Sequence, residues 1–536
     1  MSTPDLILHA GAIHTMLAEE APATSLAIEG DTIVAVGDRD SIDALRGAST
    51  EVTDLGSAVL TPGMVDGHIH PVMGIAMTAG VDLSNVCDLD GFMAALQAAP
   101  VVDGWIRGWG LDPNTFGTRP VTNEPIHRAV GTDIPVAIVM FDAHALLASD
   151  AALAAAGVTG PRGFAGNSEI VCDDNGRPTG HLLEMEAMTI VQAIMPPDAP
   201  GARRRRLREL FESMAAVGIT SGNAMDFEDD SAELMASLDS DDELAIRVRF
   251  APFCFPGFGR DMLEHIVEQQ KLGGRRWQVD GVKFMIDGTI DGGTAWLEEA
   301  DTHGESTAPF WPEPAEYRAA VSFLASHGVP TVTHAIGDAG IRYALATLES
   351  AGPSRSGAHH RIEHIETLPD DLVGEFARIG VVASMQPTHC THYTRADQSD
   401  NWSQRLGPQR AGRAWRTRDI RDTGATLALG SDWPIAPFDP RAIMADARLR
   451  RRAGHHDESP IVPEQALTAR MALEGYTSHA AAAEGVLGRA GVLAPGARAD
   501  IAAFAVDPLV APPDEVADTP VVATVMGGSF THRLEM

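Results

Sequence analysis

Six residues with metal-binding or proton-transfer side chains lie at the ends of short apolar stretches of the chain. They are His68, His70, Lys283, His334, His364 and Asp432. His68 and His70 are two positions apart, so in a strand both imidazoles point to the same face and can bind one metal ion. Imidazoles and carboxylates are common zinc ligands, and four histidines with an aspartate predict a metal centre.

Lys283 has a different chemistry, because an ammonium group has three donors and no acceptor and cannot bind a cation. Its reference pKa is about 10.4, but burial beside two cations favours the neutral amine. A neutral amine reacts with carbon dioxide to give a carbamate, whose two oxygens can bridge two divalent ions about 3.5–4 Å apart. We therefore predict that Lys283 is carboxylated by carbon dioxide or bicarbonate and that the centre is binuclear.

The six residues must be positioned by a common scaffold, and the pattern between them is one of short apolar strands alternating with helical segments. Helices are expected at 314–328 and 339–352. Eight parallel strands close a (β/α)8 TIM barrel, an α/β fold whose reacting groups lie at the carboxyl ends of the strands. The eight strands are expected at 57–70, 219–225, 245–253, 279–286, 330–336, 360–365, 381–387 and 425–432.

Both ends of the chain instead consist of short strands separated by Gly, Pro and Asp. Neither end holds enough strands to close a core, so we expect residues 1–60 and 485–536 to pair into one small β-sandwich. The metal-dependent barrel then spans 61–484. About 150 residues separate its first two strands, too many for one crossover, so we expect an insertion at about 86–215 that covers the mouth.

Composition limits the classes of partner. The chain of 536 residues carries 40 Lys and Arg against 74 Asp and Glu, a net charge of -34, which argues against nucleic acid and membrane surfaces. The N-terminus lacks a secretory signal pattern and no apolar run reaches about 18 residues, so we expect a cytoplasmic protein. Free thiols are expected at the four widely spaced cysteines, Cys87, Cys172, Cys254 and Cys390.

Several longer motifs accompany the six residues over almost the whole chain: TPGMVDGHIHP, GWIRGWGLDPNTFG, MFDAHALLASDAAL, GVKFMIDGTIDGGTAWL, THAIGDAGI, HRIEHIE and SDWPIAPFDP. The order of the ligand residues resembles the amidohydrolase superfamily with a carboxylated lysine. The motifs resemble its amidohydrolase-3 branch, which includes N-substituted formamide deformylases. The ligand set is specific for the superfamily, whereas the branch motifs indicate fold more than substrate.

The resemblance implies a role for each ligand. His68, His70 and Asp432 would hold the more buried ion, and His334 and His364 the more exposed one. The carboxylated lysine would bridge the ions together with a hydroxide. Two ions lower the pKa of a shared water towards neutrality and polarise a substrate carbonyl. Asp432 would accept the proton of the hydroxide and deliver it to the leaving nitrogen.

The substrate contacts are predicted from fewer signals. The resemblance places His144 near the mouth, where it would act in catalysis through a hydrogen bond to the substrate carbonyl or the oxyanion. In the turn after the lysine strand the family often has Ser and Arg, whereas this chain has Thr289-Ile290-Asp291. That departure removes a cation beside the substrate and puts an acidic ligand in doubt. Further candidates for substrate binding are Trp109, His389, His392 and Trp433.

These observations predict a hydrolase that cleaves the non-peptide C–N bond of a linear amide, such as an N-formyl or N-acyl amine. Hydrolysis of a cyclic amide, carbamate or lactone is the alternative, and a barrel that serves only as an interaction protein would be expected to have lost ligands. Zinc is the default metal, with manganese, iron or cobalt also compatible with the ligands. We expect a small-molecule substrate, and the sequence leaves open a homo-oligomer such as a dimer or tetramer.

Overall fold

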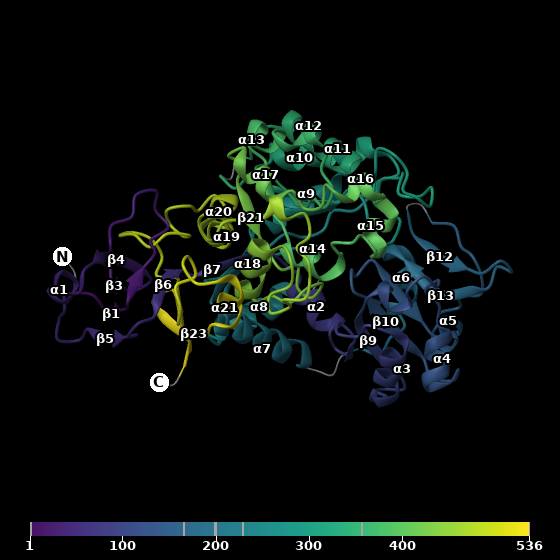
Figure 1. Ribbon diagram of the computed structural model, residues 1–536, viewed down its shortest axis with the longest axis horizontal. Helices are drawn as coiled ribbons and strands as arrows, with labels where there is room; N and C mark the ends of the chain where they lie inside the picture. Colours follow the sequence, from purple (N-terminus) through teal and green to yellow (C-terminus); the bar gives the residue numbers. More distant parts are fainter. Residues whose placement is uncertain (1–2, 165–166, 198–200, 228–229, 355–356, 535–536) are drawn as a thin grey trace.

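The computed structural model describes residues 3–164, 167–197, 201–227, 230–354 and 357–534. Figure 1 shows three regions side by side. The strands of the two termini lie at one end, parallel strands surrounded by helices lie in the middle, and residues 81–192 lie at the other end. The middle region contains the six residues singled out above.

Each of the eight predicted stretches contains a strand of the middle region. A further short strand, β16 (Trp277–Val279), was not predicted separately and pairs with its neighbour in the sheet. The eight strands are β7 (Met64–Ile69), β14 (Ile219–Ala224), β15 (Arg247–Phe250), β17 (Val282–Met285), β18 (Thr331–Ala335), β19 (Arg361–His364), β20 (Val382–Met385) and β21 (Leu427–Leu429).

These strands form two parallel sheets, with the orders β16-β15-β14-β7 and β17-β18-β19-β20-β21. Isolated parallel bridges link the facing edges of the sheets. Phe253, just after β15, pairs with Lys283 of β17, and Ile69 of β7 pairs with Trp433, just after β21. The result is a TIM-barrel-like α/β arrangement in which the strand ends converge.

The connecting helices follow the predicted pattern. α10 (Pro314–Ser326) starts at a proline, whose fixed φ suits the first helical position. α11 (Asp338–Ala351) buries Ile341, Leu345 and Leu348 along one face and ends at Gly352, whose φ of 73° favours glycine. Among the described residues, no helix has both the length and the apolar character needed to cross a membrane.

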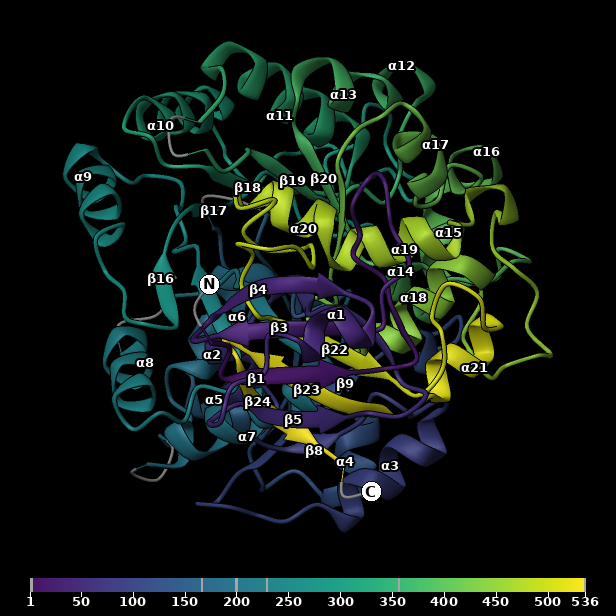
Figure 2. The same ribbon diagram turned by 90° about the vertical axis from the view of Figure 1, so that its left-hand side faces the viewer.

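Strands from the two ends of the chain share a sheet. One sheet has the order β4-β3-β1-β5, and a second has the order β2-β6-β22-β23-β24. In the second sheet β6 pairs with β22 in antiparallel register, and Figure 2 shows the first sheet in front of it. The strands are β1 (Leu6–His9), β2 (Ala12–Ile13), β3 (Ser25–Glu29), β4 (Thr32–Gly37), β5 (Glu51–Asp54), β6 (Val59–Pro62), β22 (Ile501–Phe504), β23 (Val521–Met526) and β24 (Ser529–Arg533).

A single hydrophobic cluster joins these two sheets, because it contains Leu8 and Ile28 of the first and Leu60 and Ile501 of the second. The predicted strand at 57–70 is in fact two strands, β6 in the terminal region and β7 in the middle region. Gly63 lies between them, where a Cβ would be 2.2 Å from Oγ1 of Thr220. A larger residue would therefore disturb the step of the chain from one region to the other.

The segment between β7 and β14 builds a sheet of its own, in the order β12-β13-β11-β10-β9-β8. Two hydrophobic clusters pack on it, one around Phe92 and Ile138 and the other around Leu146 and Met188. Its strands are β8 (Val81–Asp82), β9 (Ile106–Leu111), β10 (Val136–Met140), β11 (Ala145–Ala148), β12 (Glu169–Cys172) and β13 (Pro178–Leu183).

His360, directly before β19, gives the fold a predictable response to acid. Its Nδ1 accepts a hydrogen bond from the backbone N–H of Thr331, 3.1 Å away, and burial lowers the pKa of His360 to about 4. The ordinary pKa of histidine is about 6.5, so on acidification the unfolded chain takes up this proton first. The stabilising contribution is complete above pH 6.5 and is lost as the pH falls towards 4.

We expect His360→Asn, which keeps an acceptor for Thr331, to show a smaller loss of Tm between pH 7 and pH 5 than the wild type. Thermal unfolding at both pH values measures this difference. The exposed His455→Asn serves as the control for loss of a histidine. An equal loss of Tm in wild type and His360→Asn would contradict the prediction.

Candidate metal centre

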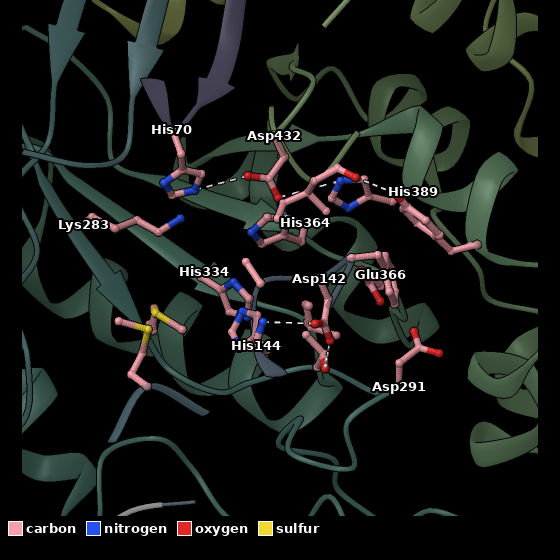
Figure 3. Close-up of a pocket in the computed structure, with 18 of the residues that line it drawn as sticks. His70, Asp142, His144, Lys283, Asp291, His334, His364, Glu366, His389 and Asp432 are labelled. Carbon is pink, nitrogen blue, oxygen red and sulfur yellow. Dashed lines mark hydrogen bonds and ion pairs between the residues drawn. The ribbon is translucent and has the colours of Figure 1, made fainter. Parts of the chain in front are cut away.

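All six predicted ligand residues are buried and converge at the carboxyl ends of the central strands. Figure 3 labels five of them around one cavity. The sixth, His68, is fully buried and adjoins His70. The convergence follows from the parallel topology, because the carboxyl ends of parallel strands meet at one side of the barrel.

Backbone contacts between β7 and the segment after β21 bring Asp432 beside the first two histidines. The N–H of Asp432 donates to the carbonyl of His68 at 2.7 Å, and the N–H of His70 donates to the carbonyl of Trp433 at 2.8 Å. Asp432 has a φ of 60°. Such left-handed geometry at a residue other than glycine costs on the order of 1–3 kcal/mol and persists where surrounding structure holds it.

Nε2 of His68 lies at the centre of the cluster. It is 3.2 Å from Oδ1 of Asp432, 3.3 Å from Nε2 of His70 and 3.3 Å from Nζ of Lys283. Nε2 of His70 is also 3.2 Å from Oδ1 of Asp432. Nitrogen and oxygen donors from three strand ends therefore point to one small volume.

The remaining two histidines extend the cluster. The ring of His364 lies 5.0 Å from that of His68 and 4.5 Å from that of His334, measured between centroids. His68, His364 and Asp432 each offer a ligand atom, and these atoms lie within 4.8 Å of one another. His364 is thus as close to His68 and Asp432 as to His334, and the division of the ligands between two ions stays a prediction.

Hydrogen bonds on the outer side of three imidazoles determine which nitrogen faces the cluster. In a metal site the nitrogen of a histidine that does not bind the ion usually donates to a carboxylate or carbonyl. The nitrogens left facing inward are Nε2 of His68, Nε2 of His364 and Nδ1 of His334. The outer pairs are His68 Nδ1 with Glu363 Oε2 at 2.6 Å, His364 Nδ1 with Gln386 Oε1 at 2.9 Å, and His334 Nε2 with the Gly288 carbonyl at 3.1 Å.

The donor set fits divalent cations. Burial lowers the pKa of His68, His334 and His364 well below the ordinary value, so the imidazoles are neutral, as ligands must be. Nδ1 of His70 is buried without a hydrogen-bond partner among the described residues, and Oδ1 of Asp432 lies 3.2 Å from Nε2 of both His68 and His70. A buried carboxylate among neutral imidazole nitrogens fits a bound cation.

Lys283 is buried among these ligands, with 2% of its surface exposed. Burial lowers its pKa to about 8, although the nearby carboxylates of Glu363 and Asp432 oppose the shift. A lower pKa increases the fraction of neutral amine, which is the form that reacts with carbon dioxide. The environment of Lys283 therefore favours the predicted carboxylation.

Glu363 orients His68 and was not identified as a site residue from the sequence. It belongs to β19, whereas His68 is at the end of β7, and the contact joins positions 295 residues apart. Its second oxygen lies 3.1 Å from Nε of Arg361, so the buried carboxylate has a cationic partner. The motif HRIEHIE contained Glu363, but only the fold reveals which histidine it contacts.

We expect Glu363→Gln to weaken metal binding by about 10- to 100-fold, because the amide binds the imidazole of His68 less strongly than the carboxylate does. Titration of metal-free protein with Zn²⁺ measures this affinity. Glu375→Gln, on the outer helix α13 (Glu375–Ile379), is a matched control. Wild-type affinity in Glu363→Gln would show that the contact does not orient a ligand.

His144 lies directly before β11 and faces the metal cluster, with its ring 5.2 Å from that of His334. Its Nδ1 is 3.0 Å from Oε2 of Glu184, a buried residue with a φ of 62°. Burial alone would lower the pKa of His144, but the charge of Glu184 raises it to about 9. A protonated imidazole here can donate a hydrogen bond to an oxyanion in the cavity.

The four residues predicted to contact substrate differ in position. His389 lines the cavity, whereas Trp109, His392 and Trp433 do not belong to its lining. Trp109 is half-buried on β9, and Trp433 packs against Phe438 with 6.4 Å between ring centroids. His389 and His392 lie in helix α14 (Pro387–Tyr393) rather than at a strand end, and His392 turns towards Asp446.

The cavity also has lining residues that sequence reasoning missed. Asp142 precedes His144 by two positions, and Glu366 follows His364 by two. Both occur within quoted motifs, so their proximity to recognised residues was the available signal. Asp291, noted from the sequence as a departure from the family pattern, lines the same cavity.

Comparison with known proteins agrees with this geometry. A model of the Amidohydrolase family matches residues 51–532. YtcJ of Bacillus subtilis (strain 168), named as an amidohydrolase, is 26% identical over 98% of this chain and 99% of its own. N-substituted formamide deformylase of Arthrobacter pascens is 24% identical over 99% and 98%. An uncharacterized metal-dependent hydrolase from Pyrococcus horikoshii matches with a TM-score of 0.74 and 22% identity over 95% and 99%, which supports the fold.

Proposed function

The chain belongs to the amidohydrolase family, and from this premise we propose that it hydrolyses the non-peptide C–N bond of a linear amide, such as an N-formyl or N-acyl amine. Membership makes the protein a metal-dependent hydrolase of that family. The observation that carries the proposal is the convergence of four histidines, a lysine and an aspartate on one buried volume. The deformylase relative supports the choice of a linear amide.

We assign the metal ligands from this chemistry. When bound, divalent ions, with zinc as first choice, supply a water of lowered pKa and polarise the substrate carbonyl. The ligands would be His68, His70, His334, His364, Asp432 and Lys283, the last as its carbamate. A requirement for bicarbonate follows, because the amine of an uncarboxylated lysine offers no bridging oxygens.

Asp432 would act as the proton carrier. Burial by itself raises its pKa, but hydrogen bonding to His70 and the charge of that imidazole hold the pKa below the ordinary value. The group is therefore an ionised acceptor next to the reacting volume. It takes a proton from the attacking water and returns it to the leaving nitrogen, which departs as an amine.

His144 would stabilise the oxygen of the substrate. Its Nδ1 contacts Glu184, so its Nε2 is left for the substrate carbonyl. A hydrogen bond that strengthens as negative charge develops on that oxygen lowers the barrier to attack. His389, which lines the same cavity, is assigned to substrate binding.

We also propose that residues 61–484 form a closed (β/α)8 barrel and that residues 1–60 and 485–536 form a β-sandwich. The bridges at Lys283 and Trp433 support closure, and the shared hydrophobic cluster supports the sandwich. Within this arrangement, the segment at about 86–215 contributes His144 and Asp142 to the mouth. We propose a small-molecule substrate on the basis of this buried cavity.

Hydrolysis of a substrate panel tests the function, measured as amine release for the linear amides and carbamates and as loss of substrate for the cyclic imides and lactones. The enzyme is first reconstituted with Zn²⁺ and bicarbonate, and the panel contains N-formyl amines, N-acyl amines, cyclic imides, carbamates and lactones. We expect the N-formyl or N-acyl amines to be hydrolysed with the highest kcat/KM of all the compounds in the panel. Turnover confined to cyclic imides, carbamates or lactones would contradict the preference for linear amides while leaving the metal site in place.

A further inference from the structure

The cavity that contains the metal ligands carries three further carboxylates on one side. Asp142, Asp291 and Glu366 all belong to its lining, and Figure 3 shows them together, with His70 and Lys283 on the opposite side. The three come from separate parts of the fold: the segment after β10, the turn after β17 and the segment after β19. A substrate bound at the metal ligands would thus extend towards an acidic wall.

Every hydrogen bond that these three carboxylates accept from the described residues comes from a neutral donor. Asp142 accepts from the hydroxyl of Thr289 at 3.1 Å and the N–H of His144 at 3.0 Å. Oδ1 of Asp291 accepts from the side-chain amide of Asn401 at 3.0 Å. Oε2 of Glu366 accepts from the indole of Trp402 at 2.7 Å. One oxygen of Asp291 and one of Glu366 remain available to a ligand.

No lysine or arginine among the described residues compensates the charge of this wall, and the charge of His144 acts on Asp142. Within the described ranges, none of the three carboxylates forms an ion pair with a lysine or arginine. Lys283 is the one lysine or arginine among the described residues that line the cavity, and it lies with the metal ligands. A buried carboxylate without a cationic partner takes up a proton unless a ligand supplies the positive charge, and a cationic ligand would keep these groups ionised.

Aromatic side chains complete the acidic side of the cavity. The rings of Phe141 and Tyr393 are 4.0 Å apart, and those of Trp402 and Trp415 are 4.9 Å apart. Aromatic faces attract cations, and ammonium groups are recognised by such surroundings. Trp415 is 1% exposed, and its indole nitrogen has no hydrogen-bond partner in the described part of the chain. An indole N–H donates and cannot bind an ammonium group, so this donor is a second, independent sign of a polar ligand in the cavity and does not bear on the ligand's charge.

Asp142 and Asp291 also line a neighbouring cavity of about 490 Å³, which is formed mainly by the 113–121 segment and the 291–294 and 305–308 turns. Asp142 and Asp291 therefore lie where the cavity with the candidate metal ligands meets this second cavity. Burial raises the pKa of Asp291 to about 8, a shift that a bound cation would oppose. A long substrate bound at the candidate metal ligands could therefore extend past these carboxylates into the second cavity.

We propose that the substrate carries a protonated amine in addition to the scissile amide, and that Asp291 and Glu366 bind this amine while Asp142 adds negative charge. The proposal rests on the proposed amide hydrolysis, because the amide must reach the metal ligands at the other end of the cavity. The substrate class is then a mono-acylated diamine or a similar basic amide.

The test compares two substrates of equal length, N-formyl-1,4-diaminobutane and N-formylpentylamine, with the reconstituted wild-type enzyme. We expect kcat/KM to be at least about tenfold higher for the cationic substrate, since charge-assisted hydrogen bonds distinguish ammonium from methyl. Equal values of kcat/KM, or a preference for N-formylpentylamine, would overturn the proposal. This comparison needs no variant and does not depend on the folding of one.

Asp291→Asn identifies the residue responsible. The amide side chain can still accept from Asn401, so the turn is retained while the charge is lost. We expect KM for the cationic substrate to rise at least about tenfold, with KM for the neutral substrate unchanged. Asp174→Asn removes the same charge at an exposed hairpin position and is the control. Equal changes for both substrates would overturn the assignment of Asp291.

Binding of butylammonium, measured by calorimetry, separates this proposal from the proposed function. Asp291-dependent binding without hydrolysis of any amide would overturn amide hydrolysis and keep the cation site. Hydrolysis of amides without binding of butylammonium and without preference for the cationic substrate would overturn the cation site and keep amide hydrolysis.

Discussion

Replacing Asp432 with asparagine is expected to lower kcat by about 10²-fold or more, because the amide can neither accept the proton of the attacking water nor deliver it to the leaving nitrogen. Asparagine has nearly the same shape, and the N–H of position 432 still donates to the carbonyl of His68. The fold and at least part of the metal content should therefore be retained. Steady-state kinetics, elemental analysis and circular dichroism of Asp432→Asn measure the three quantities.

Asp371→Asn provides the matched control for the aspartate change, because Asp371 is exposed and pairs with Arg342 on the outer surface. Its kcat should equal that of the wild type. Near-native kcat in Asp432→Asn would contradict the role of Asp432 and move the proton transfer to another group, with His144 the next candidate. Loss of all metal in the variant would instead make Asp432 mainly a ligand.

Lys283→Ala has the second large expected effect, the loss of metal together with activity. Alanine removes the group whose carbamate would bridge the ions, and it leaves a gap beside Nε2 of His68. Short carboxylic acids such as acetate or propionate should restore part of the activity, because they can supply the missing pair of oxygens. Metal content and amine release, each measured with and without added acid, test the expectation.

The sequence offers an unusually direct control for this experiment, because Lys271 is the only other lysine of the chain. Lys271 is exposed at the end of a helix and pairs with Glu268. Lys271→Ala should keep full metal content and activity. Wild-type metal content in Lys283→Ala would contradict the bridging role, and rescue of Lys271→Ala by acids would show that the acids act elsewhere.

The convergence of the six candidate ligands was predictable because it depends on local order. Each candidate lies in or shortly after a parallel strand, and parallel strands bring their carboxyl ends to one side without any further information. His68 and His70 also illustrate this, since a period of two places both on one face. The same reasoning placed a predicted stretch over each of the eight central strands, whereas the closed barrel and the β-sandwich stay proposals.

What the sequence did not reveal depends on long-range contacts or on a local change of conformation. Glu363 contacts a histidine 295 positions away, a pairing that no spacing rule indicates. The chain after β20 turns into a helix at Pro387, so the two histidines predicted to share the mouth diverge, and only His389 reaches the cavity. Gly63 lies between two strands that belong to different sheets. The uninterrupted apolar pattern of residues 57–70 gave no sign of this break.

The measurement that tests the binuclear assignment most directly is the number of metal ions per chain. Purified wild-type protein is reconstituted with Zn²⁺ and bicarbonate, dialysed against metal-free buffer and analysed by elemental analysis at known protein concentration. Two ions per chain are predicted, with activity in amine release proportional to occupancy. A chain that retains no metal after this treatment, while still releasing amine from an amide, would contradict a metal-dependent mechanism at these six residues.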